Sequence, residues 1–90
     1  MRHYNVRISG RVQGVGFRYF TLRKAREYNI NGYVRNMPDG SVEAYAIGDR
    51  NILDQFLTDL KKGPYGSVVD RVEVEWSTAA KDYDTFSITY

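Results

Sequence analysis

Polar and apolar side chains alternate along residues 2–9, the first segment of the chain. Tyr4, Val6 and Ile8 fall on one side of this segment, whereas polar residues fall on the other. Because the side chains of a strand point alternately to its two faces, this period of two predicts a β-strand with one buried face. The single histidine, His3, lies on the polar side, so we expect it at the surface.

The period changes to that of a helix after this strand. Apolar and small side chains recur at helical spacing over residues 17–28 and again over residues 50–62, which predicts two amphipathic helices. Gly63 and Pro64 end the second pattern, because glycine and proline are typical of helix C-termini. The first stripe consists of Phe17, Phe20, Thr21, Ala25 and Tyr28, and the second of Ile52, Leu53, Phe56, Leu57 and Leu60.

The remaining apolar segments have the pattern of strands. Residues 33–37 and 41–47 flank a Pro-Asp-Gly turn and therefore predict a hairpin. Residues 67–76 predict a long strand, and after a polar loop at residues 77–84 the segment 85–90 can add a short terminal strand. In the long strand, the pattern places Val68, Asp70, Val72, Val74 and Trp76 on one side. Trp76 and Tyr90 are expected to be packing residues.

The predicted order of elements is β-α-β-β-α-β, with the short extra strand at the C-terminal end. This order is that of the α+β, ferredoxin-like split βαβ arrangement, in which two helices cover one face of an antiparallel four-stranded sheet. With 90 residues, the chain is expected to form one domain over residues 1–90. The fold hosts many functions, so it does not by itself predict one.

Composition excludes several classes of function. The sequence has no cysteine, which excludes disulfides, thiolate metal ligands and cysteine nucleophiles. No apolar run approaches the ~18 residues that a membrane span needs, and the start lacks a signal-peptide core. We therefore expect a cytoplasmic protein that does not interact with membranes.

Charge is distributed unevenly along the chain. Residues 1–36 hold eight basic residues and one acidic residue, a net charge of +7, whereas residues 37–90 carry a net charge of −5. An electropositive first third indicates an anionic ligand such as a phosphate, a carboxylate or a nucleic acid. A solvated basic face is the alternative, and charge alone does not exclude it.

A glycine-rich turn, "GRVQGVGFR" at residues 10–18, lies between the first strand and the first helix. Gly14 and Gly16 permit positive φ angles and carry no side chain that would obstruct a ligand. Several N–H groups can therefore point into one concavity in front of a helix N-terminus, and Arg18 can reach the same place with its planar fork. A phosphate or carboxylate site is one interpretation, and a tight turn with a surface arginine is the other.

Two better-known glycine motifs do not fit this turn. The dinucleotide-binding fingerprint requires a glycine where Tyr19 stands. The nucleotide P-loop pattern would begin at Gly10 and meets Val15 in place of its second glycine. The turn therefore does not predict a nucleotide-binding fold.

Asn36 stands at the end of the second predicted strand, directly before "MPDG". In the split βαβ arrangement this strand end can lie near the glycine-rich turn. An amide side chain both accepts and donates hydrogen bonds, so Asn36 can hold a water molecule in line with a bound phosphorus atom. The alternative is that Asn36 only stabilises the following turn, because asparagine is common in turns. We expect this role of Asp39 as well.

With both motifs identified, the sequence closely resembles the acylphosphatase family. "GRVQGVGFR" is similar to the first family signature and "GYVRNMPDGSVEAYAIG" at residues 32–48 to the second, and the likeness continues through "KGPYGSVVDRVEVEW". It covers nearly the whole chain. Residues 29–31 and Tyr65 depart from the family pattern, and neither segment belongs to the implied site.

The resemblance implies hydrolysis of the carboxyl–phosphate bond of a small-molecule acyl phosphate, with inorganic phosphate as product and without metal or cofactor. In this chain it implies that Arg18 binds the phosphoryl group and that Asn36 orients the attacking water. It implies further phosphate contacts from the backbone N–H groups of Gln13, Gly14, Val15, Gly16 and Phe17. A carboxylate leaves unprotonated at neutral pH, so such a site needs no general acid. We expect a monomer and no nucleic-acid partner.

Two alternatives use the same fold. An RNA-binding module would agree with the basic first third, but no segment has the RNP1 pattern and the third strand carries only one aromatic residue. The chain could also correspond to the phosphate-recognition part of a larger carbamoyl-transfer enzyme, against which its length of 90 residues argues. The sequence does not identify the physiological acyl phosphate.

Overall fold

The structure is a computed structural model that describes residues 1–77 and 82–90. Residues 78–81 of the polar loop expected at residues 77–84 therefore lie outside the described residues. In chain order the elements are β1 (Arg2–Arg11), α1 (Phe17–Glu27), β2 (Asn31–Asn36), β3 (Val42–Gly48), α2 (Arg50–Lys62), β4 (Val68–Ser77) and β5 (Phe86–Ile88).

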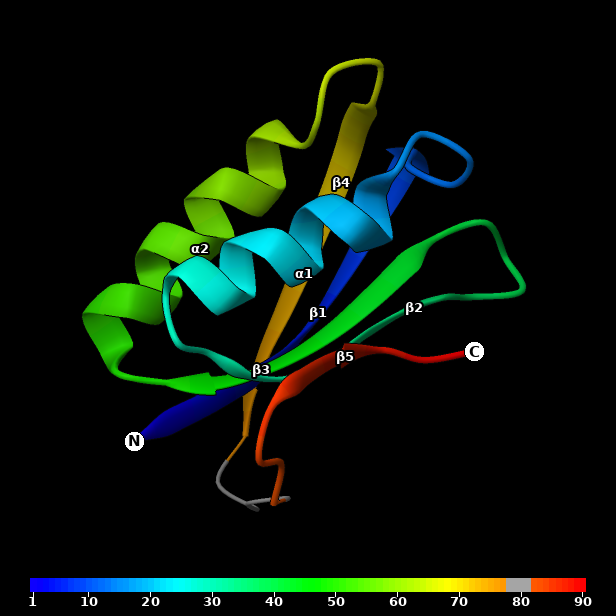
Figure 1. Cartoon of the computed structure of the whole chain (residues 1–90). Coiled ribbons are helices and arrows are strands. Elements are labelled where there is room, and N and C mark those ends of the chain that lie inside the picture. Colours follow the sequence, from blue (N-terminus) through cyan, green and yellow to red (C-terminus); the bar gives the residue numbers. More distant parts are fainter. Residues whose placement is uncertain (78–81) are drawn as a thin grey trace.

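The described strands form one five-stranded sheet in the order β4-β1-β3-β2-β5, and both helices cover the same face of it (Figure 1). The four longer strands pair antiparallel, as expected for the ferredoxin-like fold, which is confirmed. The short C-terminal strand also forms, but it pairs parallel to β2, so the sheet has five strands and is mixed rather than four-stranded and antiparallel. Pairing with β5 covers the edge that β2 would otherwise expose.

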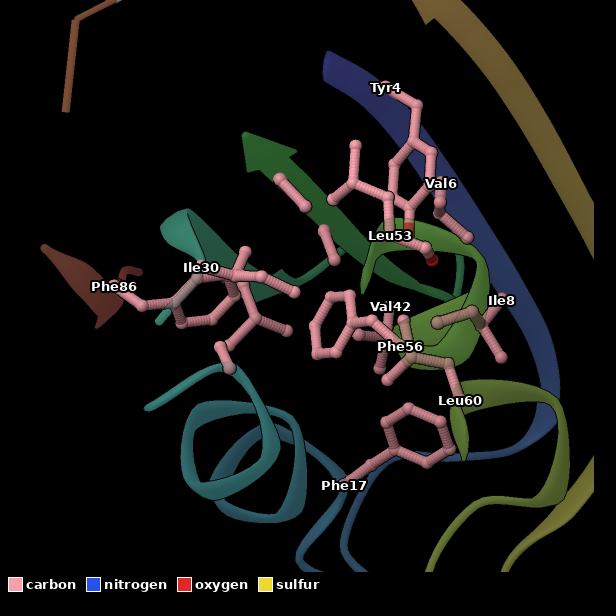
Figure 2. Packing of buried hydrophobic residues seen from close by; sticks show 14 of the residues in the cluster. Tyr4, Val6, Ile8, Phe17, Ile30, Val42, Leu53, Phe56, Leu60 and Phe86 are labelled. Atoms are coloured by element: carbon pink, nitrogen blue, oxygen red, sulfur yellow. The ribbon is translucent and has the colours of Figure 1, made fainter. Parts of the chain in front are cut away.

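The core lies between the sheet and the two helices. Tyr4, Val6 and Ile8 of β1 are fully buried, as their alternation predicts, and meet the apolar stripe of α2 (Figure 2). The Tyr4 hydroxyl donates a hydrogen bond of 2.8 Å to the Leu53 carbonyl oxygen. Burial, with a smaller effect of the Asp54 charge, raises the pKa of this hydroxyl, so Tyr4 remains a hydrogen-bond donor. Each fully buried side chain of this kind contributes about 1.5–3 kcal/mol.

A bulge changes the phase of β4 and corrects one prediction. The pairing of β1 with β4 shifts between Ser9 and Gly10, so that Gly10 lies opposite Val69. Gly10 has φ +129°, and an added Cβ would lie 2.2 Å from the Val68 carbonyl oxygen, so only glycine fits there. As a result Val68 is 53% exposed and Val69 packs against the core instead. The bulge lies where β1 leads into the glycine-rich turn.

The sheet face away from the helices is partly covered by its own side chains. His3 is only 9% exposed, so the expectation of a surface residue is wrong. Its ring lies 6.2 Å from that of Tyr45 on the neighbouring strand, and Tyr45 stacks on Tyr33 at 5.9 Å. Strand periodicity identified the correct face for His3, but the bulk of the neighbouring tyrosines determines its burial.

An ion pair joins β2 to β3 one residue before Asn36. The Arg35 Nε donates to the Glu43 Oε1 at 2.7 Å, and these two residues are direct cross-strand partners. Burial acts to raise the pKa of Glu43, but the hydrogen bond and charge of Arg35 outweigh it. The pKa of Glu43 therefore lies below its ordinary value of 4.5.

Glu43→Gln is expected to lower the free energy of unfolding by about 1–2 kcal/mol near neutral pH, because it removes the charged acceptor of this bond. Since folding lowers the pKa of Glu43, its contribution is present above 4.5 and is lost as the pH falls through the folded-state pKa. Urea unfolding of the wild type and of Glu43→Gln should therefore give free energies of unfolding whose difference becomes smaller as the pH falls. A difference of constant size across the acid range would contradict the ion-pair interpretation.

Candidate active site

The glycine-rich turn adopts left-handed backbone conformations at two positions. Gly14 has φ +75° and Gly16 has φ +76°, and an added Cβ at either would meet nothing within 4 Å. Glycine is therefore needed for the backbone angle and not because of crowding. Gly16 is also the N-cap of α1, whose first turn has neither a side-chain cap nor an acidic residue. The positive end of the helix is thus available to an anion.

A hollow of about 160 Å³, here called the loop hollow, opens at this turn. It is lined by five of the residues predicted for the site: Gly14, Gly16, Phe17, Arg18 and Asn36. The fold thus brings Arg18 and Asn36 together from the N-terminus of α1 and the end of β2. Two predicted residues do not line the hollow. Val15 packs against the core, and the Gln13 side chain points to the turn between β2 and β3.

Arg18 is the basic side chain of the loop hollow and forms no ion pair with any described residue. Half of the basic residues in the first third of the chain are paired with acids, so they do not form one free basic face. These are Arg7, Arg23, Lys24 and Arg35. The charge of Arg18 is therefore available to an anion in the hollow.

Sequence reasoning missed the aromatic rim of the hollow. Tyr90 was expected to be a packing residue but is 97% exposed, and its ring centroid lies 5.3 Å from the Arg18 guanidinium carbon, a cation–π distance. Tyr19, 65% exposed, is a second ring of the rim. Tyr90 reaches this place because β5 runs parallel to β2 toward its Asn36 end (Figure 1). No local sequence signal predicts that pairing.

Asn36 carries an unusual buried acceptor. Its side-chain oxygen Oδ1 is buried and has no hydrogen-bond partner among the described residues. A buried acceptor without a partner costs about 1–3 kcal/mol, so its retention needs a reason. The following turn is closed without it: the Asp39 carboxylate accepts bonds from the Ser41 N–H and hydroxyl, which lower the pKa of Asp39. The predicted turn role of Asp39 is thus confirmed, whereas Asn36 takes no side-chain part in that turn.

Comparison with known proteins identifies the family of the chain. A family model described as acylphosphatase matches residues 4–88. The chain belongs to the acylphosphatase family. It is 51% identical to an acylphosphatase of Archaeoglobus fulgidus over 83 residues, which cover 92% of each chain. It is 49% identical over 90 residues to an acylphosphatase of Thermotoga maritima, covering all of this chain and 99% of the relative.

Two solved structures have the same fold over almost the whole of this chain. The acylphosphatase of Bacillus subtilis superposes with a TM-score of 0.97 at 40% identity, and the match covers both chains completely. The full-length HypF in its phosphate- and nucleotide-bound form matches with a TM-score of 0.87 at 33% identity, over 99% of this chain and 12% of the HypF chain. The predicted resemblance is confirmed, and the protein is a hydrolase that acts on acyl phosphates, with phosphate as a product.

Other surface features of this family member offer less chemistry. A depression of about 370 Å³ along α1 is lined by residues of that one helix, among which Arg23 and Glu27 pair at 3.8 Å. In residues 1–77 and 82–90, no group of three or more histidine or carboxylate side chains is placed to hold a metal ion. No helix in the described part is long and apolar enough to cross a membrane.

Proposed function

We propose that the loop hollow hydrolyses acyl phosphates by direct attack of water on phosphorus, with Arg18 binding the phosphoryl group and Asn36 orienting the water. The observation that carries this proposal is the unpartnered Asn36 Oδ1 in the same hollow as Arg18 and the glycine-rich turn. Asn36 lines the hollow, and an acceptor without a partner in the free enzyme keeps its lone pairs for a water molecule that enters with the substrate.

Arg18 and the turn supply the charge stabilisation in this proposal. A phosphoryl group in transfer carries negative charge on its three equatorial oxygens and needs preorganised donors around them. The Arg18 guanidinium offers two parallel N–H groups to two of these oxygens. The backbone N–H groups of residues 13–17 and the positive end of α1 complete the cradle. Gln13 and Val15 take part through the backbone only.

Asn36 positions the nucleophile in the proposed reaction. Its Oδ1 accepts one O–H of the water, which fixes the direction of the oxygen lone pair toward phosphorus. A bond forms between the water oxygen and phosphorus, and the bond from phosphorus to the carboxyl oxygen breaks. The bonding electron pair leaves with the carboxylate. A phosphate oxygen of the substrate takes the proton of the water, because the lining of the hollow contains no histidine, lysine or carboxylate side chain.

The lining of the hollow also contains no carboxyl, histidine or lysine side chain that could protonate a leaving group, and its two phenols, Tyr19 and Tyr90, lie exposed at the rim, which restricts the substrates. A carboxylate leaving group has a conjugate acid with a pKa of about 4, so it departs unprotonated near neutral pH. The alkoxide or phenoxide of a phosphomonoester is far more basic and requires a proton. The proposed site therefore prefers acyl phosphates to phosphomonoesters for a chemical reason and not for reasons of shape.

Benzoyl phosphate and phenyl phosphate test this preference as a matched pair, because both present an aromatic ring and a phosphoryl group. In the presence of EDTA, phenyl phosphate is expected to be hydrolysed about 10²–10⁴-fold more slowly, the range that a missing general acid accounts for. Absorbance reports benzoyl phosphate turnover, and phosphate release reports both reactions. Inorganic phosphate should inhibit competitively. Equal rates for the two substrates, or loss of turnover in EDTA, would refute the mechanism.

A further inference from the structure

The Gln13 side chain connects the two halves of the site. We propose that Gln13 is a positioning residue, whose side chain holds the glycine-rich turn against the turn that follows Asn36 and so fixes the distance between bound phosphorus and attacking water. This inference rests on the proposed roles of Arg18 and Asn36. It assigns to the Gln13 side chain a role separate from the backbone contact described above.

Two hydrogen bonds carry the proposal. The Gln13 Nε2 donates to the Met37 carbonyl oxygen at 2.8 Å and to the Ser41 carbonyl oxygen at 2.9 Å. These acceptors lie 24 and 28 residues away in the sequence. An amide nitrogen carries two hydrogens, so both donors of Gln13 are used. The side chain is partly buried, so it does not simply rest on the surface.

The two acceptors are the carbonyl groups that close the β2–β3 turn. The Ser41 carbonyl oxygen also accepts from the Met37 N–H at 2.8 Å, and the Met37 carbonyl oxygen accepts from the Gly40 N–H at 3.1 Å. Gln13 thus joins a network that is already ordered. Because Asn36 directly precedes Met37, the position of this turn also sets the position of the Asn36 amide.

The connection is needed because the glycine-rich turn has little else to hold it there. No other side-chain hydrogen bond between described residues joins residues 12–16 to residues 37–41. Gly14 and Gly16 provide no side-chain packing of their own. Misplacement of reacting groups by about 1 Å can cost on the order of 10²-fold in rate. The hydrogen bonds of Gln13 between the two turns are therefore expected to affect the rate more than the binding of phosphate.

Gln13→Met tests this role, since methionine has nearly the same shape and no donor. Its kcat for benzoyl phosphate is expected to fall about 10- to 100-fold. The Kd for inorganic phosphate, measured by titration in NMR, should stay within about threefold, because Arg18 and the N-terminus of α1 remain. The control is Tyr28→Phe, which removes the 2.6 Å bond to Asp59 between the two helices, away from the site. It should lower stability and leave kcat unchanged.

A double-mutant cycle separates positioning from a general structural effect. If Gln13 acts by aligning the water held by Asn36, then Gln13→Met should cost less than about threefold in kcat when Asn36→Ala is already present. An equal loss in both backgrounds would overturn the proposal, as would wild-type kcat in Gln13→Met. Wild-type kcat in Asn36→Ala alone would instead refute the proposed function on which the inference rests. Should Gln13→Met not fold, Gln13→Asn replaces it, because its amide is too short to reach both carbonyls.

Discussion

Arg18→Gln is expected to lower kcat/KM for benzoyl phosphate by at least about 10³-fold. Removal of one preorganised donor from such a site costs about 10²–10³-fold, and this substitution removes a full charge and a bidentate fork together. Arg18 has no ion pair among the described residues that could compensate for its loss or suffer from it. The loss should therefore appear in activity and phosphate binding, and the free energy of unfolding should change little.

Two further arginine variants show which property of Arg18 matters. Arg18→Lys keeps the charge and loses the planar fork, so its activity should fall between those of wild type and Arg18→Gln. Arg26→Gln removes an equal charge from α1 outside the loop hollow, so it should retain wild-type turnover. The local role of Arg18 is refuted if kcat/KM of Arg18→Gln stays within about tenfold of wild type. It is also refuted if Arg26→Gln loses as much kcat/KM as Arg18→Gln.

Asn36→Ala is expected to lower kcat by about 10²–10³-fold and to leave the Kd for phosphate within about threefold. The substitution removes the group that orients the water but none of the phosphate donors. It also removes a buried acceptor that has no partner in the free protein. The free energy of unfolding should therefore stay the same or rise, by up to about 1 kcal/mol. Steady-state kinetics, phosphate titration and urea unfolding measure the three effects.

The same variant separates the two interpretations of Asn36. If Asn36 served only the turn, Asn36→Ala would lose stability and retain kcat. Asp39→Ala provides the matched comparison, because it removes the hydrogen bonds from Ser41 and the ion pair with Arg7 in that same turn. We expect Asp39→Ala to lose more stability and less activity than Asn36→Ala. The opposite order would contradict a role for Asn36 in catalysis.

A site of this kind gains its chemistry from preorganisation and not from reactive groups. Neither Arg18 nor Asn36 exchanges a proton in the proposed reaction, and the leaving carboxylate needs none. The stability cost of an unpartnered Asn36 oxygen is consistent with such a site, because a polar group held ready for the transition state is often unsatisfied beforehand. The preference for acyl phosphates and the small set of site residues then have the same explanation, which is that the reaction needs no proton from a side chain.

Short-range patterns in the sequence were sufficient for the elements and for the main chemical groups. A period of two identified the strands and a period of 3.6 identified the helices. In the predicted stripe of α2, Leu53, Phe56 and Leu60 are fully buried, and Ile52 and Leu57 are partly buried. Gly14 and Gly16 have the positive φ angles expected of them, because that requirement is local to the backbone. Arg18 and Asn36 were singled out by residue type and position at element ends, and the resemblance to the acylphosphatase family then implied their roles. Their meeting in one hollow follows from the confirmed fold.

The sequence by itself thus determined which elements form, which faces are buried and which residues carry polar chemistry, because each of these depends on neighbours within a few positions. Only the tertiary structure decided the bulge at Gly10, the burial of His3, the approach of Tyr90 to Arg18 and the two bonds of Gln13. Each of these depends on strand register or on hydrogen bonds between distant segments. Such pairings are set by the packing of the whole chain, and no local period records them.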